Sequence, residues 1–501
     1  MQQPAPSSAT YDLLVIGGGI NGAGIARDAA GRGLSVVLAE KDDLAGATSS
    51  ASSKLIHGGL RYLEQYEFRL VAEALAEREV LLRTARHLVW PARFVMPHVP
   101  DLRPRWMIRA GLFLYDHLAR RASLAGSNAV RIDRPPLNSG LKPELRHGFE
   151  YSDCRVDDAR LVIANAMSAR ELGALILTRT ECLGARRENG IWHATLSGGH
   201  QIAARAIVNA SGPWVKRTLN DRLAQPSADA VRMVKGSHIV LPRQYEGDHA
   251  FILQNDDRRV VFMIPYEGRF TLVGTTDVAV EEPAAPLVAR EEIEYLCRAA
   301  NRYLANAARP EQVLWQYSGV RPLYDDGSSD PSAVTRDYTL RVDDEGGRAP
   351  VLSVFGGKIT TYRRLAEHVM EKLQGYFPAC KGAWTATAAL SGSDFGAEGR
   401  EAVRAALASR YSRIPGALLR ALFRRHGSKT ADVLGDARET ADLGEDFGGG
   451  LTEREVAYFV EREWATTADD VLWRRTKAGL QMTEGQRARV AQQLGEHATP
   501  R

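Results

Sequence analysis

A glycine-rich turn between two apolar segments near the N-terminus limits the fold of this chain more than any other part of it. Residues 11–16 (YDLLVI) are typical of a buried parallel strand, and Gly17, Gly19 and Gly22 follow them in GxGxxG spacing. A helical pattern comes next, and residues 35–39 (SVVLA) predict a second strand. The complete pattern predicts a β-α-β unit that binds a dinucleotide.

Each glycine of this unit has its own physical role. Gly17 permits the tight turn, Gly19 lets the backbone approach a pyrophosphate, and Gly22 lets the predicted helix over residues 20–32 pack close to the strand. The N-terminus of that helix offers N–H groups and a partial positive charge to the phosphates. Glu40, at the end of the second strand, is expected to accept hydrogen bonds from a ribose. The alternative is a tight turn without a ligand, which would not require the second strand or the acidic residue.

Two further segments favour FAD over NAD as the dinucleotide. Residues 46–53 (GATSSASS) follow the acidic strand end, and their hydroxyls and amides are suited to a diphosphate or a flavin edge, although a flexible loop has the same composition. Gly356 and Gly357, followed by Lys358, end a predicted strand over 351–355 and indicate another close backbone approach. A flavin is long enough to need contacts this distant in the sequence.

The order of predicted elements indicates an α/β chain, α+β overall, with three domains, since 501 residues exceed one hydrophobic core. Strand-like runs at 249–254, 259–265 and 269–275 alternate with turns, which predicts an antiparallel meander in a separate substrate domain. The expected domains are a discontinuous FAD-binding domain (1–75, 150–230 and 320–388), a substrate or cap domain (76–149 and 231–319) and a C-terminal helical domain (389–501).

Strand patterns disappear after about residue 390, and two helix starts are predicted in the C-terminal domain. Thr452 and Glu455 have the spacing of a capping box. Thr467 to Asp470 predicts the start of another helix that runs through Leu480.

Composition excludes several classes of protein. The net charge of +4, from 65 Lys and Arg against 61 Asp and Glu, is too balanced to indicate nucleic-acid binding. The four cysteines form no CxxC pair, which argues against a metal site and a disulfide framework and favours a reducing cytosol. The N-terminus lacks the pattern of a signal peptide, and no apolar run reaches transmembrane length.

A chain of this kind that works at a membrane must therefore lie on its surface. Residues 103–121 (RPRWMIRAGLFLYDHLARR) place apolar side chains, among them Trp106, Leu112 and Phe113, between arginines at both ends. This pattern is typical of an interfacial helix. A buried domain helix with solvated ends has the same pattern and is an equal alternative.

Stretches from near the start to near the end of the chain resemble one known family, the FAD-dependent respiratory glycerol-3-phosphate dehydrogenases, and in particular the bacterial aerobic type. The GxGxxG part is shared with many flavoproteins, whereas SSKLIHGGLRYLE and SVFGGKITTYR are far more specific. The matching stretches are LLVIGGGINGAGIARDAAGRGLSVVLAE, ATSSASSKLIHGGLRYLE, EYSDCRVDDARL, NASGPWV, KGSHIV, VGTTDV, YSGVRPL, SVFGGKITTYRRLAEH and DDVLWRRTK.

The resemblance implies oxidation of sn-glycerol 3-phosphate to dihydroxyacetone phosphate, with electrons passing to FAD and then to a membrane quinone. It implies a Rossmann-like FAD-binding domain of the D-amino-acid-oxidase type, a cap, and a peripheral position on the cytoplasmic side of the inner membrane. It leaves the oligomeric state open, a homodimer included. A glycerol-3-phosphate oxidase that uses oxygen, and a flavin-binding protein without turnover, are the alternatives. No DxDxDG calcium loop and no cysteine-rich C-terminal region are present.

The phosphate of such a substrate needs fixed cations, and arginine suits it best. Arg61, which follows a glycine pair, and Arg321, in YSGVRPL, are the candidates, with a surface ion pair as the alternative for each. Lys358 is expected to bind the substrate or to stabilise charge on the reduced flavin. Tyr62 is expected to line the substrate site, although an aromatic residue beside a glycine pair also suits packing.

Oxidation of the alcohol needs a base that titrates near neutrality. His238 (KGSHIV) and His57 (LIHGG) are the candidates, each with a core histidine as the alternative. His238 is the preferred base, and His57 is expected to pack near the cofactor. Thr360 and Thr361 are expected to cap the next helix and face the flavin.

The expected cofactor-binding residues share a place in a glycine turn, the serine-rich segment or a helix start. They are Gly17, Gly19, Gly22, Glu40, Thr48, Ser49, Ser50, Ser53, His57, Gly59, Gly212, Gly357, Thr360 and Thr361.

Overall fold

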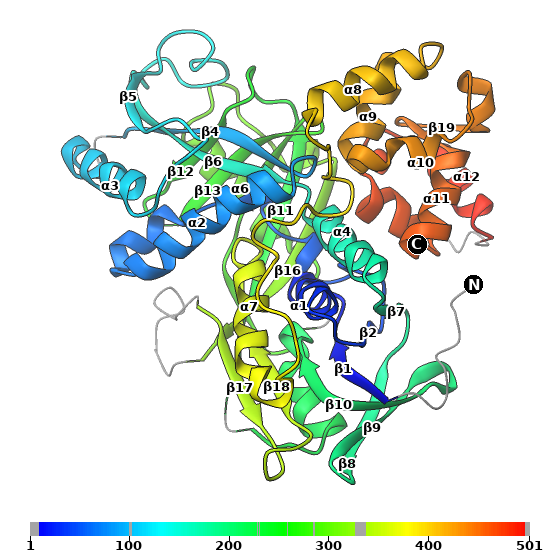
Figure 1. Cartoon of the computed structure of the whole chain (residues 1–501). Helices are drawn as coiled ribbons and strands as arrows, with labels where there is room; N and C mark the ends of the chain where they lie inside the picture. The colour runs from blue at the N-terminus through cyan, green and yellow to red at the C-terminus, as the bar shows by residue number, and fades with distance from the viewer. Residues whose placement is uncertain are drawn as a thin grey trace.

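Two large β-sheets and a helical C-terminal domain make up the chain (Figure 1). The computed structural model describes residues 10–99, 103–227, 229, 231–257, 259–283, 286–325 and 337–495. In Figure 1 the first sheet lies in the lower half of the view, the second lies above it, and the C-terminal helices lie at the upper right.

The first sheet has a parallel centre, in the order β17-β18-β10-β1-β2-β7. Along β1 the side chains alternate, so that Leu13 and Val15 pack into one core cluster while Leu14 and Ile16 pack into another. Both faces of the strand are therefore buried, as its continuous apolar run predicts. The strands are β1 (Thr10–Ile16), β2 (Val36–Ala39), β7 (Leu175–Leu177), β8 (Cys182–Glu188), β9 (Ile191–Leu196), β10 (Gln201–Asn209), β17 (Thr339–Asp343) and β18 (Val351–Phe355).

Helices α1 (Ile20–Gly31), α4 (Asp158–Glu171) and α7 (Tyr362–Leu373) cover one face of this sheet, and α1 packs between the other two. The close approach of α1 requires glycine at two positions. A Cβ on Gly22 would lie 1.9 Å from the carbonyl oxygen of Gly17, and a Cβ on Gly24 would lie 2.6 Å from the ring of Tyr362. The structure thus confirms the β-α-β unit and the packing role of Gly22.

The second sheet is mainly antiparallel, in the order β15-β11-β14-β13-β12-β4-β6-β3, with β16 beside β11 and β5 beside β6. It contains the predicted meander as β12, β13 and β14. Its strands are β3 (Leu55–Ile56), β4 (Val89–Pro97), β5 (Asn128–Arg131), β6 (His147–Val156), β11 (Val231–Pro242), β12 (Ala250–Gln254), β13 (Val260–Tyr266), β14 (Phe270–Gly274), β15 (Val278–Val280) and β16 (Trp315–Tyr324). Its helices are α2 (Phe68–Thr84), α3 (Arg105–His117) and α6 (Arg290–Asn301).

Two of the expected domain boundaries shift in the structure. The boundary at residue 150 falls inside β6, and the boundary at residue 320 falls inside β16. Both strands pair along their length with the second sheet, β6 with β4 and β16 with β11. The sequence predicted no strand at either place, which is why the expected boundaries fall inside both strands.

The C-terminal domain is helical apart from a short pair of strands, β19 (Asp446–Gly448) and β20 (Leu451–Thr452), which the sequence did not predict. Its core is continuous with the core beneath α1 and α4. The helices are α8 (Gly399–Arg410), α9 (Gly416–His426), α10 (Thr430–Leu434), α11 (Glu453–Glu463) and α12 (Glu484–Gln493).

The predicted start of α11 at Thr452 is confirmed, but its capping box is not. Thr452 is the N-cap of α11 but makes no side-chain capping hydrogen bond. Glu455 instead accepts hydrogen bonds from Arg425 and His426, each at 2.7 Å. The Glu455 carboxylate is thus engaged by Arg425 and His426 and not by the backbone of Thr452.

The second predicted helix is a short π-type turn (Asp470–Arg475) followed by a separate 3-10 turn (Ala478–Leu480). Arg474 and Arg475 both donate to the carboxylate of Asp43 in the first domain. Consecutive side chains of a regular α-helix point about 100° apart. A wider turn lets both arginines reach one acceptor.

Candidate active site

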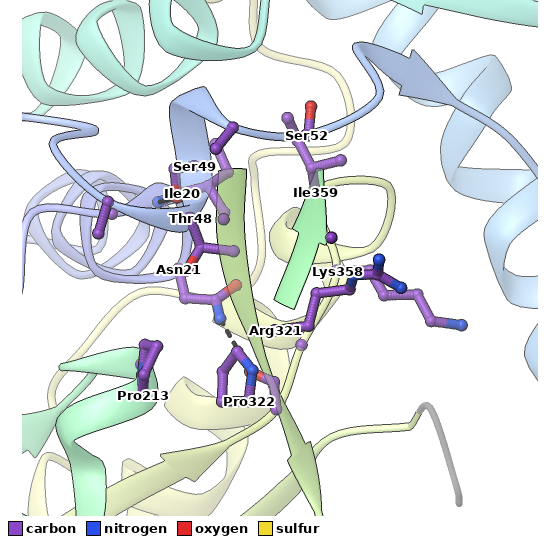
Figure 2. Close-up of a pocket in the computed structure, with 18 of the residues that line it drawn as sticks. Ile20, Asn21, Thr48, Ser49, Ser52, Pro213, Arg321, Pro322, Lys358 and Ile359 are labelled. Carbon is purple, nitrogen blue, oxygen red and sulfur yellow. Dashed lines mark hydrogen bonds between the residues drawn. The ribbon is translucent and has the colours of Figure 1, made fainter. Parts of the chain in front are cut away.

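A cavity of about 760 Å³ is lined by residues of both sheets. Its walls come from the turn between β1 and α1, the serine-rich segment, β11, β16 and the turn after β18 (Figure 2). Most of the residues singled out from the sequence line it: Gly17, Gly19, Glu40, Thr48, Ser49, Ser53, His57, Gly59, Arg61, Tyr62, Gly212, His238, Arg321, Gly357, Lys358 and Thr360.

The turn between β1 and α1 is held in place from outside the helix. The Ser49 hydroxyl accepts a hydrogen bond from the backbone N–H of Ile20 at 3.0 Å, at the first turn of α1. Glu40 accepts from the N–H of Gly18 at 2.6 Å and from that of Asp42 at 2.8 Å. Glu40 therefore fixes the turn as well as lining the cavity, and its carboxylate retains acceptor sites for a ribose.

The two glycine segments that are far apart in the sequence meet in this cavity. Asn21 of α1 donates to the carbonyl of Gly356 at 3.3 Å, the contact drawn dashed in Figure 2. Gly357 has φ +100°, and a Cβ there would lie 2.6 Å from the Asn21 amide nitrogen. Bare backbone therefore faces the cavity from two directions. This cradle, the helix N-terminus and Glu40 together fit the pyrophosphate, ribose and flavin of FAD.

The serine-rich segment is fixed rather than flexible, because its hydroxyls bond to three other parts of the chain. Thr48 donates to the carbonyl of Val320 at 2.6 Å, and Ser52 donates to Asp158 at 2.7 Å. The Ser53 hydroxyl lies 2.9 Å from Nε2 of His238. The segment thus connects the cofactor side of the cavity to the second sheet.

A buried ion pair, which the sequence did not predict, lies beneath this segment. Lys54 lies 2.9 Å from Asp158, both side chains are almost fully buried, and Lys54 also donates to the carbonyl of Ser50. Tyr317 of β16 donates to the carbonyl of Ser52 at 2.8 Å. Lys54 and Asp158 belong to two of the stretches that resemble the family, SSKLIHGG and CRVDDARL. That resemblance was the one feature of the sequence that could have identified them as functional residues.

His238 lies in the wall of the cavity on β11 with only 3% of its surface exposed. Its ring stacks on Tyr317 at 4.8 Å between centroids. A Cβ at Gly274, opposite on β14, would lie 2.1 Å from the ring, so glycine makes room for it. Burial, followed by the positive charges of Lys54 and Arg321, lowers the pKa of His238 well below 6.5. The imidazole is therefore neutral near pH 7, and the pKa of His238 in this substrate-free structure lies below the near-neutral value expected for the base.

The cationic candidates lie in the same cavity. Arg321 forms an ion pair with Asp277 at 2.7 Å and donates to the carbonyl of Thr276 at 2.9 Å, which orients its guanidinium. The Nζ of Lys358 lies 4.0 Å from the ring centroid of Tyr62. Figure 2 shows Arg321 and Lys358 extending to the same side of the view, away from the Asn21 and Pro213 end.

Three of the expected cofactor residues, Gly22, Ser50 and Thr361, are not among the residues that line the cavity. Gly22 acts through packing, and the Ser50 hydroxyl donates to the carbonyl of Ala47. Thr361 is the N-cap of α7 but makes no side-chain capping bond. The hydroxyl of Thr360 instead exchanges hydrogen bonds with the backbone of His57. The helical pattern in the sequence does not show that the Ser50 and Thr360 hydroxyls bond to nearby backbone groups.

The described ranges contain no group of three or more His, Cys, Asp or Glu side chains arranged to hold a metal ion. Among the helices in the same ranges, none combines the length and the apolar character that crossing a bilayer requires.

A parallel sheet with a glycine cradle, joined to an antiparallel sheet across one cavity, defines an FAD-dependent oxidoreductase. A family model described as FAD dependent oxidoreductase matches residues 12–363, and one described as the C-terminal domain of alpha-glycerophosphate oxidase matches residues 383–497. The chain is 53% identical to the aerobic glycerol-3-phosphate dehydrogenase of Escherichia coli, over 98% of this chain and 99% of that protein. It belongs to the glycerol-3-phosphate dehydrogenase family of FAD-dependent oxidoreductases.

Two more proteins place the chain within this family. It is 53% identical to the D-erythritol 1-phosphate dehydrogenase of Brucella abortus, over 96% of each chain. The crystal structure of glycerol-3-phosphate dehydrogenase from Bacillus halodurans complexed with FAD is similar in fold, with a TM-score of 0.72 and 26% identity over 98% of this chain and 94% of that one. The expected FAD cofactor and fold are thereby confirmed.

Proposed function

We propose that this chain oxidises sn-glycerol 3-phosphate to dihydroxyacetone phosphate, that FAD takes the electrons, and that a membrane quinone reoxidises the cofactor. The observation that carries the proposal is the placement of Arg61, Arg321 and Lys358 in the same cavity as the FAD cradle. Three cations there suit a phosphate dianion, and His238 supplies a neutral base in the same wall.

When bound, FAD supplies a hydride acceptor for carbon 2 of the substrate. The chain's own residues do the rest. Arg321, oriented by Asp277, and Lys358 hold the phosphate and so position the alcohol. The imidazole of His238, whose Nε2 lies 2.9 Å from the Ser53 hydroxyl, receives the proton of the substrate hydroxyl. The burial of His238 excludes water from the proton acceptor.

The protonation state of His238 can be measured by NMR. Because burial and two nearby cations lower the pKa of His238, its imidazole stays neutral as the pH falls from 8 to 6.5 in the substrate-free holoenzyme. In a sample with 13C-labelled histidine, we expect the resonance that is missing from His238→Gln to keep its neutral position over this range. A titration midpoint at or above pH 6.5 would contradict the environment described here.

The main rival concerns the substrate. The relative from Brucella abortus is named for D-erythritol 1-phosphate, and it is as similar to this chain as the enzyme from Escherichia coli. Both substrates present a phosphate and a secondary alcohol, so the three cations do not separate them. The ratio of kcat/KM for glycerol 3-phosphate to that for D-erythritol 1-phosphate decides: a ratio above one supports the proposal, and a ratio below one replaces it.

The electron acceptor needs a separate test, because a glycerol-3-phosphate oxidase would reduce its FAD with the same substrate and would differ only in what reoxidises it. Steady-state turnover in air with a soluble quinone is expected to consume quinone and to yield little hydrogen peroxide. Stoichiometric peroxide with no quinone reduction would make the chain a glycerol-3-phosphate oxidase instead.

A quinone acceptor requires contact with a membrane, and we propose α3 as that contact, on the cytoplasmic side of the inner membrane. Trp106 and Phe113 on this helix are 70% and 57% exposed, with Met107 and Leu114 beside them. Leu112, which the sequence pattern grouped with them, is fully buried and faces the core. The helix therefore offers an apolar face on one side only, between exposed Arg105 and Arg120.

Co-sedimentation with vesicles that contain anionic lipid tests this surface. Each large apolar side chain buried in lipid contributes about 1.5–3 kcal/mol, so Trp106→Ser with Phe113→Ser is expected to weaken binding at least about tenfold. The matched control changes Leu172 and Leu183, which are 44% and 43% exposed elsewhere, to serine. Equal binding by the two double variants would reject α3 as the membrane contact.

A further inference from the structure

A second cavity, of about 310 Å³, lies where the second sheet meets the C-terminal domain. It shares no lining residue with the first cavity. Its walls combine β6 and β13 of the sheet with Arg424 of α9 and Lys477 of the C-terminal domain. Five basic residues line it against three acidic ones, Asp157, Asp248 and Glu267.

Most of these cations have a carboxylate partner, and Arg155 is the exception. Arg424 pairs with Glu267 at 2.9 Å, and Lys477 lies 3.8 Å from Asp157. Within the described ranges no carboxylate lies within 4.0 Å of Arg155, which donates to the carbonyl of Pro265 at 3.1 Å. Its Nε is buried with no hydrogen-bond partner there. Burial, followed by the like charge of Arg424, lowers the pKa of Arg155, and the more distant charges of Asp248 and Glu267 offset this only in part.

Tyr266 adds a second unsatisfied donor to the same cavity. Its side chain is 7% exposed, and its hydroxyl has no hydrogen-bond partner in the part of the chain that the structure describes. Burial, followed by the charge of Glu267, raises its pKa well above 10, so the hydroxyl keeps its proton and can donate it. Buried polar groups are nearly always paired, and an unpaired one indicates a ligand or a water.

We propose that this second cavity binds a small phosphate-class dianion, either inorganic phosphate or a short phosphate monoester, through Arg155 and Tyr266. A guanidinium and a hydroxyl supply hydrogen-bond donors to phosphate oxygens, and in the described chain Arg155 is the one lining cation without a carboxylate within 4.0 Å. The volume suits such a ligand and lies at the lower limit of small-molecule sites.

The position of the site gives the ligand a structural role. Arg155 and Tyr266 belong to the sheet, whereas Arg424 and Lys477 belong to the C-terminal domain, so one anion contacts both. Lys54 also lines this cavity while its ammonium group holds the serine-rich segment of the first cavity. Anion binding is therefore expected to raise the unfolding temperature of the holoenzyme.

Equilibrium dialysis of the holoenzyme with radiolabelled inorganic phosphate tests the proposal. Arg321→Ala is the background for all measurements, because it is expected to weaken phosphate binding in the first cavity. In that background, Arg155→Gln is expected to weaken phosphate binding by roughly tenfold to a hundredfold, because a charge-assisted contact is lost. Tyr266→Phe is expected to weaken it by about fivefold, because a neutral hydrogen bond is lost.

Tyr266→Phe also keeps the test independent of folding. Its hydroxyl makes no hydrogen bond in the described chain, so without phosphate the variant is expected to melt at or above the wild-type temperature. Displacement of labelled phosphate by methyl phosphate identifies a site for monoesters, and a lack of displacement identifies one for inorganic phosphate. The proposal is overturned if the Arg321→Ala background binds no phosphate, or if Arg155→Gln and Tyr266→Phe bind it as tightly as that background.

Discussion

Gly22→Ala is expected to leave the purified protein with little bound FAD. The new Cβ would lie 1.9 Å from the carbonyl oxygen of Gly17, and backbone atoms cannot give way as a flexible side chain does. Either α1 moves away from β1 or the turn opens, and both displace the N–H groups that would face the pyrophosphate. Overpacking of this kind costs about 1–3 kcal/mol or more, which lowers FAD affinity by roughly one to two orders of magnitude.

The flavin-to-protein ratio measures this effect. The matched control is Gly485→Ala, since Gly485 also lies near the start of a helix, α12, and a Cβ there meets nothing within 4 Å. We expect the control to keep its flavin and to match the wild type in circular dichroism. A Gly22→Ala protein with full flavin content would show that the turn between β1 and α1 does not bind the cofactor.

His238→Gln is expected to bind FAD normally and to slow flavin reduction by substrate by roughly a hundredfold to ten-thousandfold, the usual contribution of a general base. Glutamine is close to histidine in size and can keep a hydrogen bond to Ser53, so the wall of the cavity is preserved. It has no basic nitrogen to accept the hydroxyl proton.

Stopped-flow reduction under anaerobic conditions separates this step from reoxidation. His249→Gln is the control, because His249 is a buried histidine beside the same sheet and does not line the cavity. The control is expected to reduce its flavin as the wild type does. If His238→Gln also reduces its flavin at the wild-type rate, the base is another group.

Local patterns predicted the parts of the fold that depend on neighbouring residues. The β-α-β unit follows from one apolar run, three glycines and a helical pattern that are contiguous in the sequence. The meander of β12, β13 and β14 follows from strands joined by short turns. In both cases strands that follow one another along the chain pair with each other, β1 with β2 and β13 with β12 and β14.

Long-range pairing was not predictable in the same way. The sequence predicted no strand at β6 or β16, and their partners in the second sheet lie far away along the chain. Leu112 illustrates the same limit on a helix. Helical spacing gathers apolar residues on a face, whereas contact with the rest of the protein decides which of them is buried.

The sequence predicted the residues that line the cavity better than the residues that orient them. Arg61, Arg321, Lys358 and His238 all line one cavity, although more than 250 residues separate the first two. The partners that orient them were not predicted, among them Asp277 for Arg321 and the pair of Lys54 and Asp158 beneath the serine-rich segment. These partners are common residue types without a local motif, and only the folded chain brings them together.

Anaerobic addition of sn-glycerol 3-phosphate to the purified holoenzyme tests the proposed reaction without any electron acceptor. We expect the visible absorbance of oxidised FAD to bleach as one equivalent of dihydroxyacetone phosphate forms for each flavin. The same experiment on Arg321→Ala is expected to need a much higher substrate concentration. A flavin that stays oxidised at saturating glycerol 3-phosphate, in a protein whose FAD is still reduced by dithionite, would contradict the proposed function.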